Sequence, residues 1–146
     1  MTFLNKTFLS SNKKYVNRNW FIIDCKNQKL GRIATFIVSL LKGKRKIHFS
    51  SSTNTGDYII LINANLIKIN KTNIHYLVYK PGKPGSSLKT KQAINSIPKL
   101  IIERSIKRML NRKEAKNLIR QLKIYNDSLH PHKSQIPFQL NFSLNN

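Results

Sequence analysis

The sequence has few acidic residues: 5 Asp and Glu stand against 27 Lys and Arg among 146 residues. The formal net charge of +22 is far more than solubility requires, and a compact chain with this charge repels itself. A polyanionic partner is therefore expected. Nucleic acid is the favoured partner, because a phosphate backbone binds many dispersed cations with the release of counterions.

Cysteine and long apolar stretches are also scarce. Cys25 is the only cysteine, which excludes an intramolecular disulfide and a cysteine-based zinc site. No stretch reaches the roughly 18 consecutive apolar residues of a membrane-spanning helix, and the positive charge is spread along the chain. We therefore expect no membrane partner, and the length of 146 residues predicts one domain with a single hydrophobic core.

The N-terminal residues 1–19, MTFLNKTFLSSNKKYVNRN, are basic, rich in hydroxyl groups and free of acids. This composition is similar to that of an organellar targeting peptide. The segment runs directly into the first expected strand, however, which favours an ordered arm or one that contacts nucleic acid. Lys outnumbers Arg by 20 to 7, and together with frequent Asn and Ile this ratio is typical of AT-rich coding genomes, such as those of organelles or reduced bacteria.

The first half of the chain has the pattern strand, helix, strand. The runs WFIID (Trp20–Asp24) and YIILI (Tyr58–Ile62) are apolar at successive positions, as in strands covered on both faces. Between them, apolar residues recur with helical spacing and form one stripe, and Gly43 is expected to end that helix. The stripe consists of Ile33, Phe36, Ile37, Leu40 and Leu41.

The second half is expected to hold a hairpin and then helices. Residues 66–69 and 74–79 have the composition of two strands joined by a tight turn, and the Pro-Gly pairs of KPGKPGSS (80–87) predict a loop. Helices are predicted at 88–97, 98–110 and 112–122, a short strand at 123–125, and an extended tail at 126–146.

A single glycine, Gly31, precedes the first helix, and Arg32 lies beside the free N–H groups of the helix start. Dinucleotide-binding loops need three glycines at fixed spacing, and a Walker loop ends in Gly-Lys-Ser/Thr. Neither pattern is complete here. Gly31 is therefore interpreted as the entry to a structural helix, with any phosphate bound there belonging to RNA.

The five acidic residues do not form an obvious catalytic set. Asp24 ends one expected strand and Asp57 precedes another, so the two carboxylates are not expected to converge for acid–base work. We expect Asp57 to cap a turn and Asp24 to accept hydrogen bonds from the loop that follows it. We therefore do not expect an enzyme, a cofactor or a small-molecule substrate.

The motif His130-Pro131-His132 allows two interpretations. Two imidazoles two residues apart can chelate a metal ion, but no third ligand is near in sequence and Lys133 follows directly. A tail that contacts RNA or protein is the favoured interpretation, with no metal site. Cys25 is expected to be a small residue of the core or of a strand end.

Basic side chains concentrate in expected loops and at helix ends, positions that reach irregular RNA backbone well. Isolated lysines such as Lys68 and Lys91 can simply solvate a surface, but this alternative does not account for a chain with so few acids. Tyr79 and Tyr125 could add stacking on unpaired bases. The candidate RNA-binding residues are Lys13, Lys14, Arg18, Arg32, Lys42, Lys44, Arg45, Lys46, Lys80, Lys83, Lys107, Arg108, Arg112, Lys113, Lys116, Arg120, Lys123, His130, His132 and Lys133.

Five motifs in order resemble the thirteenth protein of the large ribosomal subunit, in its bacterial and organellar form, over residues 20–137. Several motifs in order identify a family more strongly than any one of them. The most specific pieces are Leu30-Gly31-Arg32, Thr55-Gly56-Asp57-Tyr58, Asn63-Ala64, and His130-Pro131-His132 with Gln135 and Pro137. The motifs are WFIIDCKNQKLGRIATFIVSLLKGK, TNTGDYIILINA, PGKPGSSLK, IKRML and LKIYNDSLHPHKSQIP.

The chain departs from the family's usual residues at several points. Ser51 and Ser52 stand where a proline and a histidine usually precede the Gly-Asp pair, and Asn54 replaces an aspartate. Lys116 replaces an arginine, which retains the charge but loses the planar fork. We interpret these departures as drift in a fast-evolving or AT-biased lineage, without a new activity.

The resemblance implies a three-layer α/β/α fold around a mainly parallel sheet of about four strands, with a basic arm at 1–19, one domain at 20–125 and an extended tail at 126–146. It implies a structural role: binding large-subunit rRNA early in assembly beside neighbouring ribosomal proteins, in a mitochondrion, a plastid or a bacterial cytoplasm. Two alternatives stay open, a free regulator that binds mRNA or DNA and a nucleotide-dependent enzyme that uses the Gly31 loop.

Overall fold

The fold is built on a parallel sheet of four strands in the order β5-β2-β1-β6. A separate antiparallel pair joins β3 to β4. The computed structural model describes residues 18–51, 53–69, 75–79, 82, 88–92 and 97–141. The elements are β1 (Trp20–Asp24), α1 (Leu30–Leu41), β2 (Tyr58–Ile62), β3 (His75–Tyr79), β4 (Leu88–Gln92), α2 (Pro98–Met109), α3 (Arg112–Arg120), β5 (Leu122–Ile124) and β6 (Phe138–Leu140).

Helix α1 connects β1 to β2 in the strand, helix, strand order that the sequence predicts. Apolar residues that repeat every three or four positions form one face of a helix, and here that face is buried in the main core. Ile33, Ile37 and Leu41 have no exposed surface. The first unit of the fold is thus confirmed, with β1 and β2 paired in parallel.

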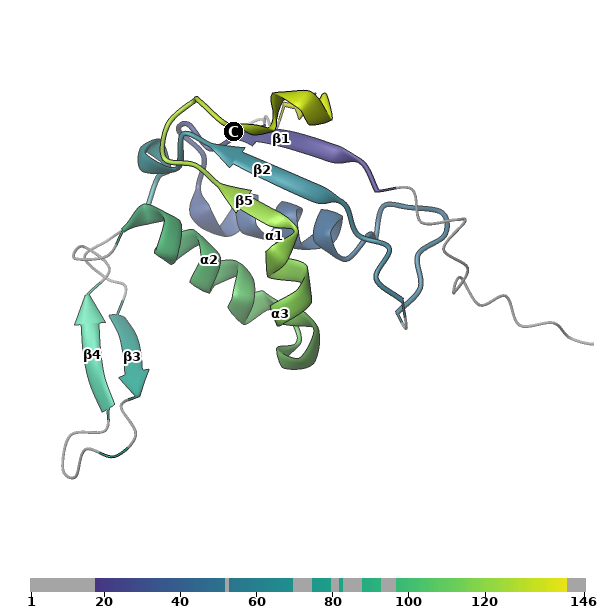
Figure 1. Ribbon diagram of the computed structural model, residues 1–146. Coiled ribbons are helices and arrows are strands. Elements are labelled where there is room, and N and C mark those ends of the chain that lie inside the picture. Colours follow the sequence, from purple (N-terminus) through teal and green to yellow (C-terminus); the bar gives the residue numbers. More distant parts are fainter. Residues whose placement is uncertain are drawn as a thin grey trace, which may run out of the picture.

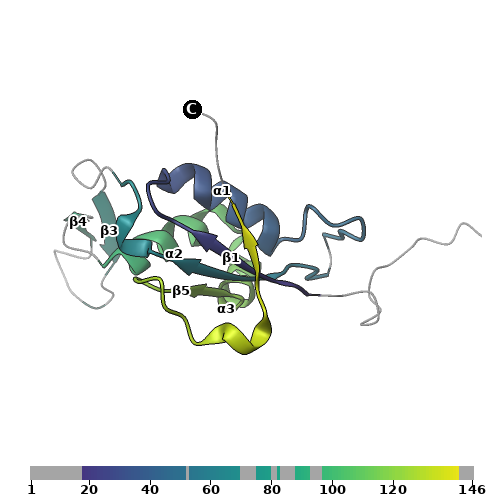
Figure 2. The ribbon, with the colours of Figure 1, turned by 90° about the horizontal axis from the view of Figure 1, so that it is seen from above.

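The sheet lies between two layers. Helices α1, α2 and α3 cover one face, and the segment after β5, with its short 3-10 helix, passes over the other face before β6 begins (Figures 1 and 2). Because side chains alternate along a strand, Ile59 and Leu61 belong to the core on the helix side while Ile60 faces the other way; all three are fully buried. The prediction of a three-layer α/β fold around a parallel sheet of four strands is confirmed.

The hairpin pairs different segments from those that the sequence predicts. Strand β3 pairs with β4, whereas residues 66–69 form no strand. Asn63 adopts a left-handed conformation with φ of 56° and precedes a 3-10 turn at Ala64–Leu66, which ends the extended run. Asn tolerates this conformation better than most residues. The turn expected at 71–73 and most of the loop at 80–87 lie outside the described residues.

The helix predicted at 88–97 is wrong over Leu88–Gln92, which forms β4. The sequence LKTKQ alternates with period two, the period of a strand, and the ladder with β3 overrides a weak helical pattern. Residues 93–96 lie outside the described part of the chain.

Helices α2 and α3 are both present as predicted, with Pro98 at the first turn of α2. The last helix ends at Arg120, two residues before its predicted end, and β5 begins one residue early at Leu122. Boundaries of this kind shift easily, because apolar residues near a junction satisfy either element.

The segment after Tyr125 carries more regular structure than the sequence predicts. It contains a 3-10 helix at His132–Gln135 and then β6, which pairs in parallel with β1 and extends the sheet. With only three residues, β6 is too short for its periodicity to be recognised. In the part of the chain that the structure describes, no helix is long and apolar enough to cross a membrane.

Candidate nucleic-acid interface

Gly43 ends helix α1 and begins a turn with four cations. We call these four residues, Lys42, Lys44, Arg45 and Lys46, the basic cluster. Its φ of 71° is left-handed, a conformation that glycine adopts without steric penalty. The Gly43 N–H donates to the Leu40 carbonyl at 2.9 Å and the Lys44 N–H to the Ser39 carbonyl at 3.0 Å, which is the hydrogen-bond pair of a Schellman motif. The predicted end of the helix is confirmed, and the cations there face the negative end of the helix dipole.

The loop before β2 packs directly on the end of α1. A Cβ atom at Gly56 would lie 1.7 Å from the Leu41 carbonyl oxygen, so only glycine allows this approach. The Asp57 N–H donates to the Leu40 carbonyl at 3.4 Å, and the Gly56 N–H donates to Oδ1 of Asn54 at 3.1 Å. The loop and the helix end therefore form one fixed unit.

Asp57 anchors this unit. Its side chain is 4% exposed and forms an ion pair with the ammonium of Lys46. The same carboxylate accepts a hydrogen bond from the Asn19 N–H at 2.9 Å, just before β1. The sequence predicts a turn cap at this position, and the structure adds a link between three segments. Lys46, a candidate RNA-binding residue, thus already has an internal acidic partner.

The other cations of the cluster differ in their surroundings. Lys44 and Arg45 are exposed, whereas Lys42 is half-buried. The guanidinium carbon of Arg45 lies 4.3 Å from the ring centroid of Phe36, a cation–π contact that holds the side chain against α1. Across the loop, the Arg18 guanidinium donates to the Asn54 carbonyl at 3.3 Å.

A second group of cations occupies the end of α2 and the outer face of α3. Ala115 and Leu118 of α3 are buried, so helical periodicity turns the basic positions outward. This agrees with the outer face that the sequence predicts for this helix. The exposed cations of the group are Lys107, Arg108, Arg112, Lys113, Lys116 and Arg120.

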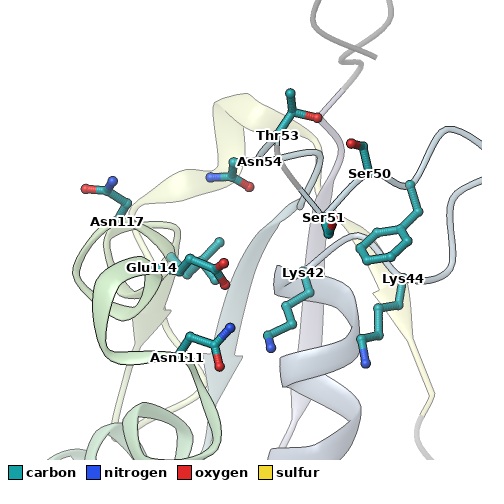
Figure 3. Close-up of a pocket in the computed structure, with 11 residues that line it drawn as sticks. Lys42, Lys44, Ser50, Ser51, Thr53, Asn54, Asn111, Glu114 and Asn117 are labelled. Carbon is teal, nitrogen blue, oxygen red and sulfur yellow. The ribbon is translucent and has the colours of Figure 1, made fainter. Parts of the chain in front are cut away.

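A pocket of about 410 Å³ lies between the two groups of cations. Lys42 and Lys44 line it just after the end of α1, and Asn111, Glu114 and Asn117 line it from the N-cap and first turns of α3 (Figure 3). Sequence patterns do not indicate this juxtaposition, because the two walls are far apart in the chain and are brought together by the packing of α1, α2 and α3.

The C-terminal segment is held over the sheet by aromatic side chains. Trp20 stacks on Tyr58 with ring centroids 4.5 Å apart, and His132 packs on Trp20 at 5.4 Å. The Tyr125 hydroxyl and His132 Nε2 are 2.8 Å apart and form a hydrogen bond. His132, a candidate RNA-binding residue, therefore has internal partners, and so does Tyr125.

Gly31 and Arg32 are exposed at the start of α1. A Cβ atom at Gly31 would meet no atom within 4 Å, so this glycine serves no close approach of the backbone. Helix α1 begins at Leu30, with Lys29 as its N-cap. The geometry fits the interpretation of Gly31 as a helix entry.

Asp24 and Cys25 have the structural roles that the sequence predicts. Asp24 accepts hydrogen bonds from the Lys26 N–H at 2.8 Å and from Nδ2 of Asn63 at 2.9 Å. Cys25 has no exposed surface, and burial, with the Asp24 charge adding to it, raises the pKa of its thiol to about 12. The thiol is therefore kept protonated and unreactive near neutral pH.

The remaining candidate residues are dispersed. Lys133 is exposed and Lys123 and His130 are half-buried. Lys13, Lys14, Lys80 and Lys83 lie outside the described residues. Within the described ranges, no three His, Cys, Asp or Glu side chains come together in a group that could hold a metal ion.

These features define a class of protein: a small, strongly basic α/β domain that presents cations from loops and helix ends around one parallel sheet. Within this class, the chain belongs to the ribosomal protein L13 family, whose model matches residues 18–131. Membership of the family, which the sequence motifs predict, is thus confirmed.

Individual relatives match nearly the whole chain. The large ribosomal subunit protein uL13c of Trieres chinensis is 42% identical over 138 residues, covering 94% of this chain and 97% of that protein. The protein of the same name from Gracilaria tenuistipitata var. liui is 42% identical over 95% of this chain and 99% of its own length. The uL13 protein of Prochlorococcus marinus (strain NATL1A) is 39% identical over 92% of each chain.

Proposed function

We propose that this protein is a structural, non-enzymatic constituent of a large ribosomal subunit that binds rRNA through dispersed cations. The observation that carries the proposal is the match over nearly the whole chain to relatives named as large ribosomal subunit protein uL13c and uL13. The net charge of +22 supports a polyanionic partner. The two uL13c relatives and the uL13 relative of Prochlorococcus marinus support a ribosome of a plastid or of a bacterial cell.

The mechanism that the geometry supports is electrostatic clamping. The α1–loop unit fixes the spacing of Lys42, Lys44 and Arg45, and the outer face of α3 offers a second set of cations. Two sets of cations on one rigid core can bind phosphates of separate rRNA segments and hold those segments at a fixed distance. Neighbouring ribosomal proteins are the further partners, and early assembly is the stage at which such a clamp acts.

Cofractionation tests this function. The tagged protein, expressed in its own organism, is followed through a sucrose gradient at moderate salt, and we expect it in the large-subunit and whole-ribosome fractions. A protein found only near the top of the gradient would favour a free regulator of mRNA or DNA. Saturable micromolar binding of ATP, GTP or NAD by the purified chain would favour the enzyme alternative at Gly31.

A further inference from the structure

We propose that the pocket between α1 and α3 binds an unpaired guanine of the RNA partner. The inference rests on the proposed function and adds to it a site that reads one base, beyond general attraction to phosphate. The pocket volume of about 410 Å³ lies within the range of roughly 300–1,000 Å³ that small-molecule sites occupy.

The first reason is the pair of opposite charges on facing walls. Lys42 lies on one wall and Glu114 on the other (Figure 3), and no ion pair joins these two described residues. Guanine carries the acceptors O6 and N7, which suit a lysine, next to N1–H and the N2 amino group, which are two donors that suit a carboxylate. Adenine and cytosine offer a single amino donor on this edge, and uracil a single imino donor.

The second reason is the neutral lining. Phe49 lines the pocket and is 43% exposed, so its ring has a free surface on which a base can stack. Asn117 of α3 and Asn111, the N-cap of that helix, bring amide groups. Unpaired bases are recognised in this way, by stacking on an aromatic ring and by hydrogen bonds to their edges.

The third reason is an unpaired hydroxyl in the wall. Oγ1 of Thr53 is buried and has no hydrogen-bond partner among the protein atoms. Buried polar atoms are nearly always paired, and a rotation of the Thr53 side chain about χ1 would turn this hydroxyl towards a ligand in the pocket. Lys44, exposed at the rim, is placed to bind the phosphate of the same nucleotide.

Glu114 also has a plain structural explanation. It stands in the first turn of α3, where a carboxylate interacts favourably with the positive end of the helix dipole. That role requires only a negative charge near the helix start, and it leaves the carboxylate oxygens free to accept from a ligand. The test must therefore separate recognition of the base from stability of the helix.

The test compares two single-stranded RNA pentamers, AAGAA and AAIAA, in which inosine lacks only the 2-amino group of guanine. Equilibrium affinities are measured with the full chain, its Glu114→Gln variant and the Glu103→Gln variant. The last makes the same charge change on α2, outside this pocket. A hydrogen bond to a charged group is worth about tenfold in affinity, so we expect wild type and Glu103→Gln to prefer AAGAA by about tenfold.

The Glu114→Gln variant is expected to bind both pentamers with nearly equal affinity. The four affinities of wild type and Glu114→Gln for the two pentamers form a double-mutant cycle. The expected result shows that the 2-amino group of guanine and the Glu114 carboxylate interact directly. Equal binding of both pentamers by wild type, or an unchanged preference in Glu114→Gln, would overturn the proposal. Thermal unfolding of each variant shows whether the loss of the charge has affected α3.

A Phe49→Leu variant tests the stacking part. Leucine keeps an apolar side chain but removes the aromatic ring, so both pentamers should bind several-fold more weakly with their ratio unchanged. An affinity unaffected by this change would contradict a base stacked on Phe49. If wild type cofractionates with large subunits but does not distinguish the pentamers, the guanine site is wrong and the proposed function stands; absence from subunits would reject the function itself.

Discussion

The ammonium of Lys46 forms an ion pair with the carboxylate of Asp57, whose side chain is 4% exposed. The pair closes a loop of the chain that begins at the end of α1 and ends at the start of β2. Because Asp57 also accepts the N–H of Asn19, one buried carboxylate connects the basic cluster, the loop and the entry to β1. The last cation of the basic cluster thus has a role in the stability of the fold.

Replacing Lys46 with alanine should destabilise the protein. The substitution leaves the Asp57 carboxylate buried with one partner fewer, and an unpaired buried charge is costly. Since Lys46 is itself 24% exposed, water can partly replace it, and we expect the free energy of unfolding to fall by about 1–3 kcal/mol. Urea unfolding followed by circular dichroism measures the change.

The matched control is Lys44→Ala, which removes the same charge from an exposed neighbour. Its free energy of unfolding should stay within about 0.5 kcal/mol of wild type. Equal stability of the two variants would show that the ion pair does not stabilise the fold.

Replacing His132 with alanine should loosen the C-terminal segment from the sheet. The change removes the hydrogen bond to Tyr125 and the packing on Trp20, and β6 follows only two residues after the 3-10 helix that contains His132. We expect faster amide hydrogen exchange in β6, with slow exchange retained in β2. Trp20 is the only tryptophan, so its fluorescence reports the loss of the contact directly.

A Tyr125→Phe variant grades this effect. It removes the hydroxyl and keeps the ring, so the rate of amide exchange in β6 should lie between those of wild type and His132→Ala. The lost hydrogen bond should lower the free energy of unfolding by about 0.5–1.5 kcal/mol. Unchanged exchange in both variants would mean that the pairing of β6 with β1 is sufficient to hold the segment.

The parts of the fold that the sequence predicts well are those fixed by local pattern. The apolar stripe of α1, the left-handed glycine at position 43 and the two apolar runs of β1 and β2 each follow from the preferences of neighbouring residues. Strands β4 and β6 do not follow from the preferences of neighbouring residues. LKTKQ pairs as a strand with the distant β3, and the three residues of β6 pair with β1, next to ring contacts of His132 with Trp20 and of Phe138 with Phe21.

The candidate interface shows the same division. Sequence alone predicts that loops and helix ends carry the cations, since composition and helical periodicity decide which positions face outward. It does not predict that Lys46 pairs with Asp57, because both residues lie on loops whose path depends on the approach of Gly56 to α1. Nor does it predict the pocket, whose walls come from the turn and loop after α1 and from the start of α3, which are distant in the chain.

Neutralising Lys44 and Arg45 together should weaken rRNA binding and reduce its salt dependence. Each phosphate contact contributes about 0.7–0.9 to the slope of log affinity against log salt, so the double change to glutamine should lower the slope by up to about 1.8. Filter binding to large-subunit rRNA over a series of salt concentrations gives the slope.

The corresponding control neutralises Lys26 and Lys29, which are exposed near the other end of α1. This control changes the net charge equally but leaves the basic cluster intact, and its slope should fall less. If the two double variants have the same slope, binding depends on total charge and not on the cluster after α1.

The thiol of Cys25 should make stability fall at high pH. Burial raises its pKa from the ordinary value of 9.0 to about 12, so above pH 9 the unfolded chain loses a proton that the folded chain keeps. The free energy of unfolding should therefore fall by up to about 1.4 kcal/mol for each pH unit from this group. In a Cys25→Ala variant, the free energy of unfolding should fall less steeply with pH. Equal slopes for both proteins between pH 9 and 11 would exclude a contribution of the Cys25 thiol.

Two glycine-to-alanine substitutions should have opposite consequences. In Gly56→Ala the new Cβ would lie 1.7 Å from the Leu41 carbonyl oxygen, so the loop must leave the end of α1, and we expect a loss of about 3 kcal/mol or more in the free energy of unfolding. Gly31→Ala places its methyl group in open space in the first turn of α1, where alanine is the better helix former by up to about 1 kcal/mol. Chemical unfolding measures the stability of both variants. A strongly destabilised Gly31→Ala would mean that the fold requires glycine at position 31 for more than the start of the helix. A stable Gly56→Ala would contradict the close packing of the loop on α1.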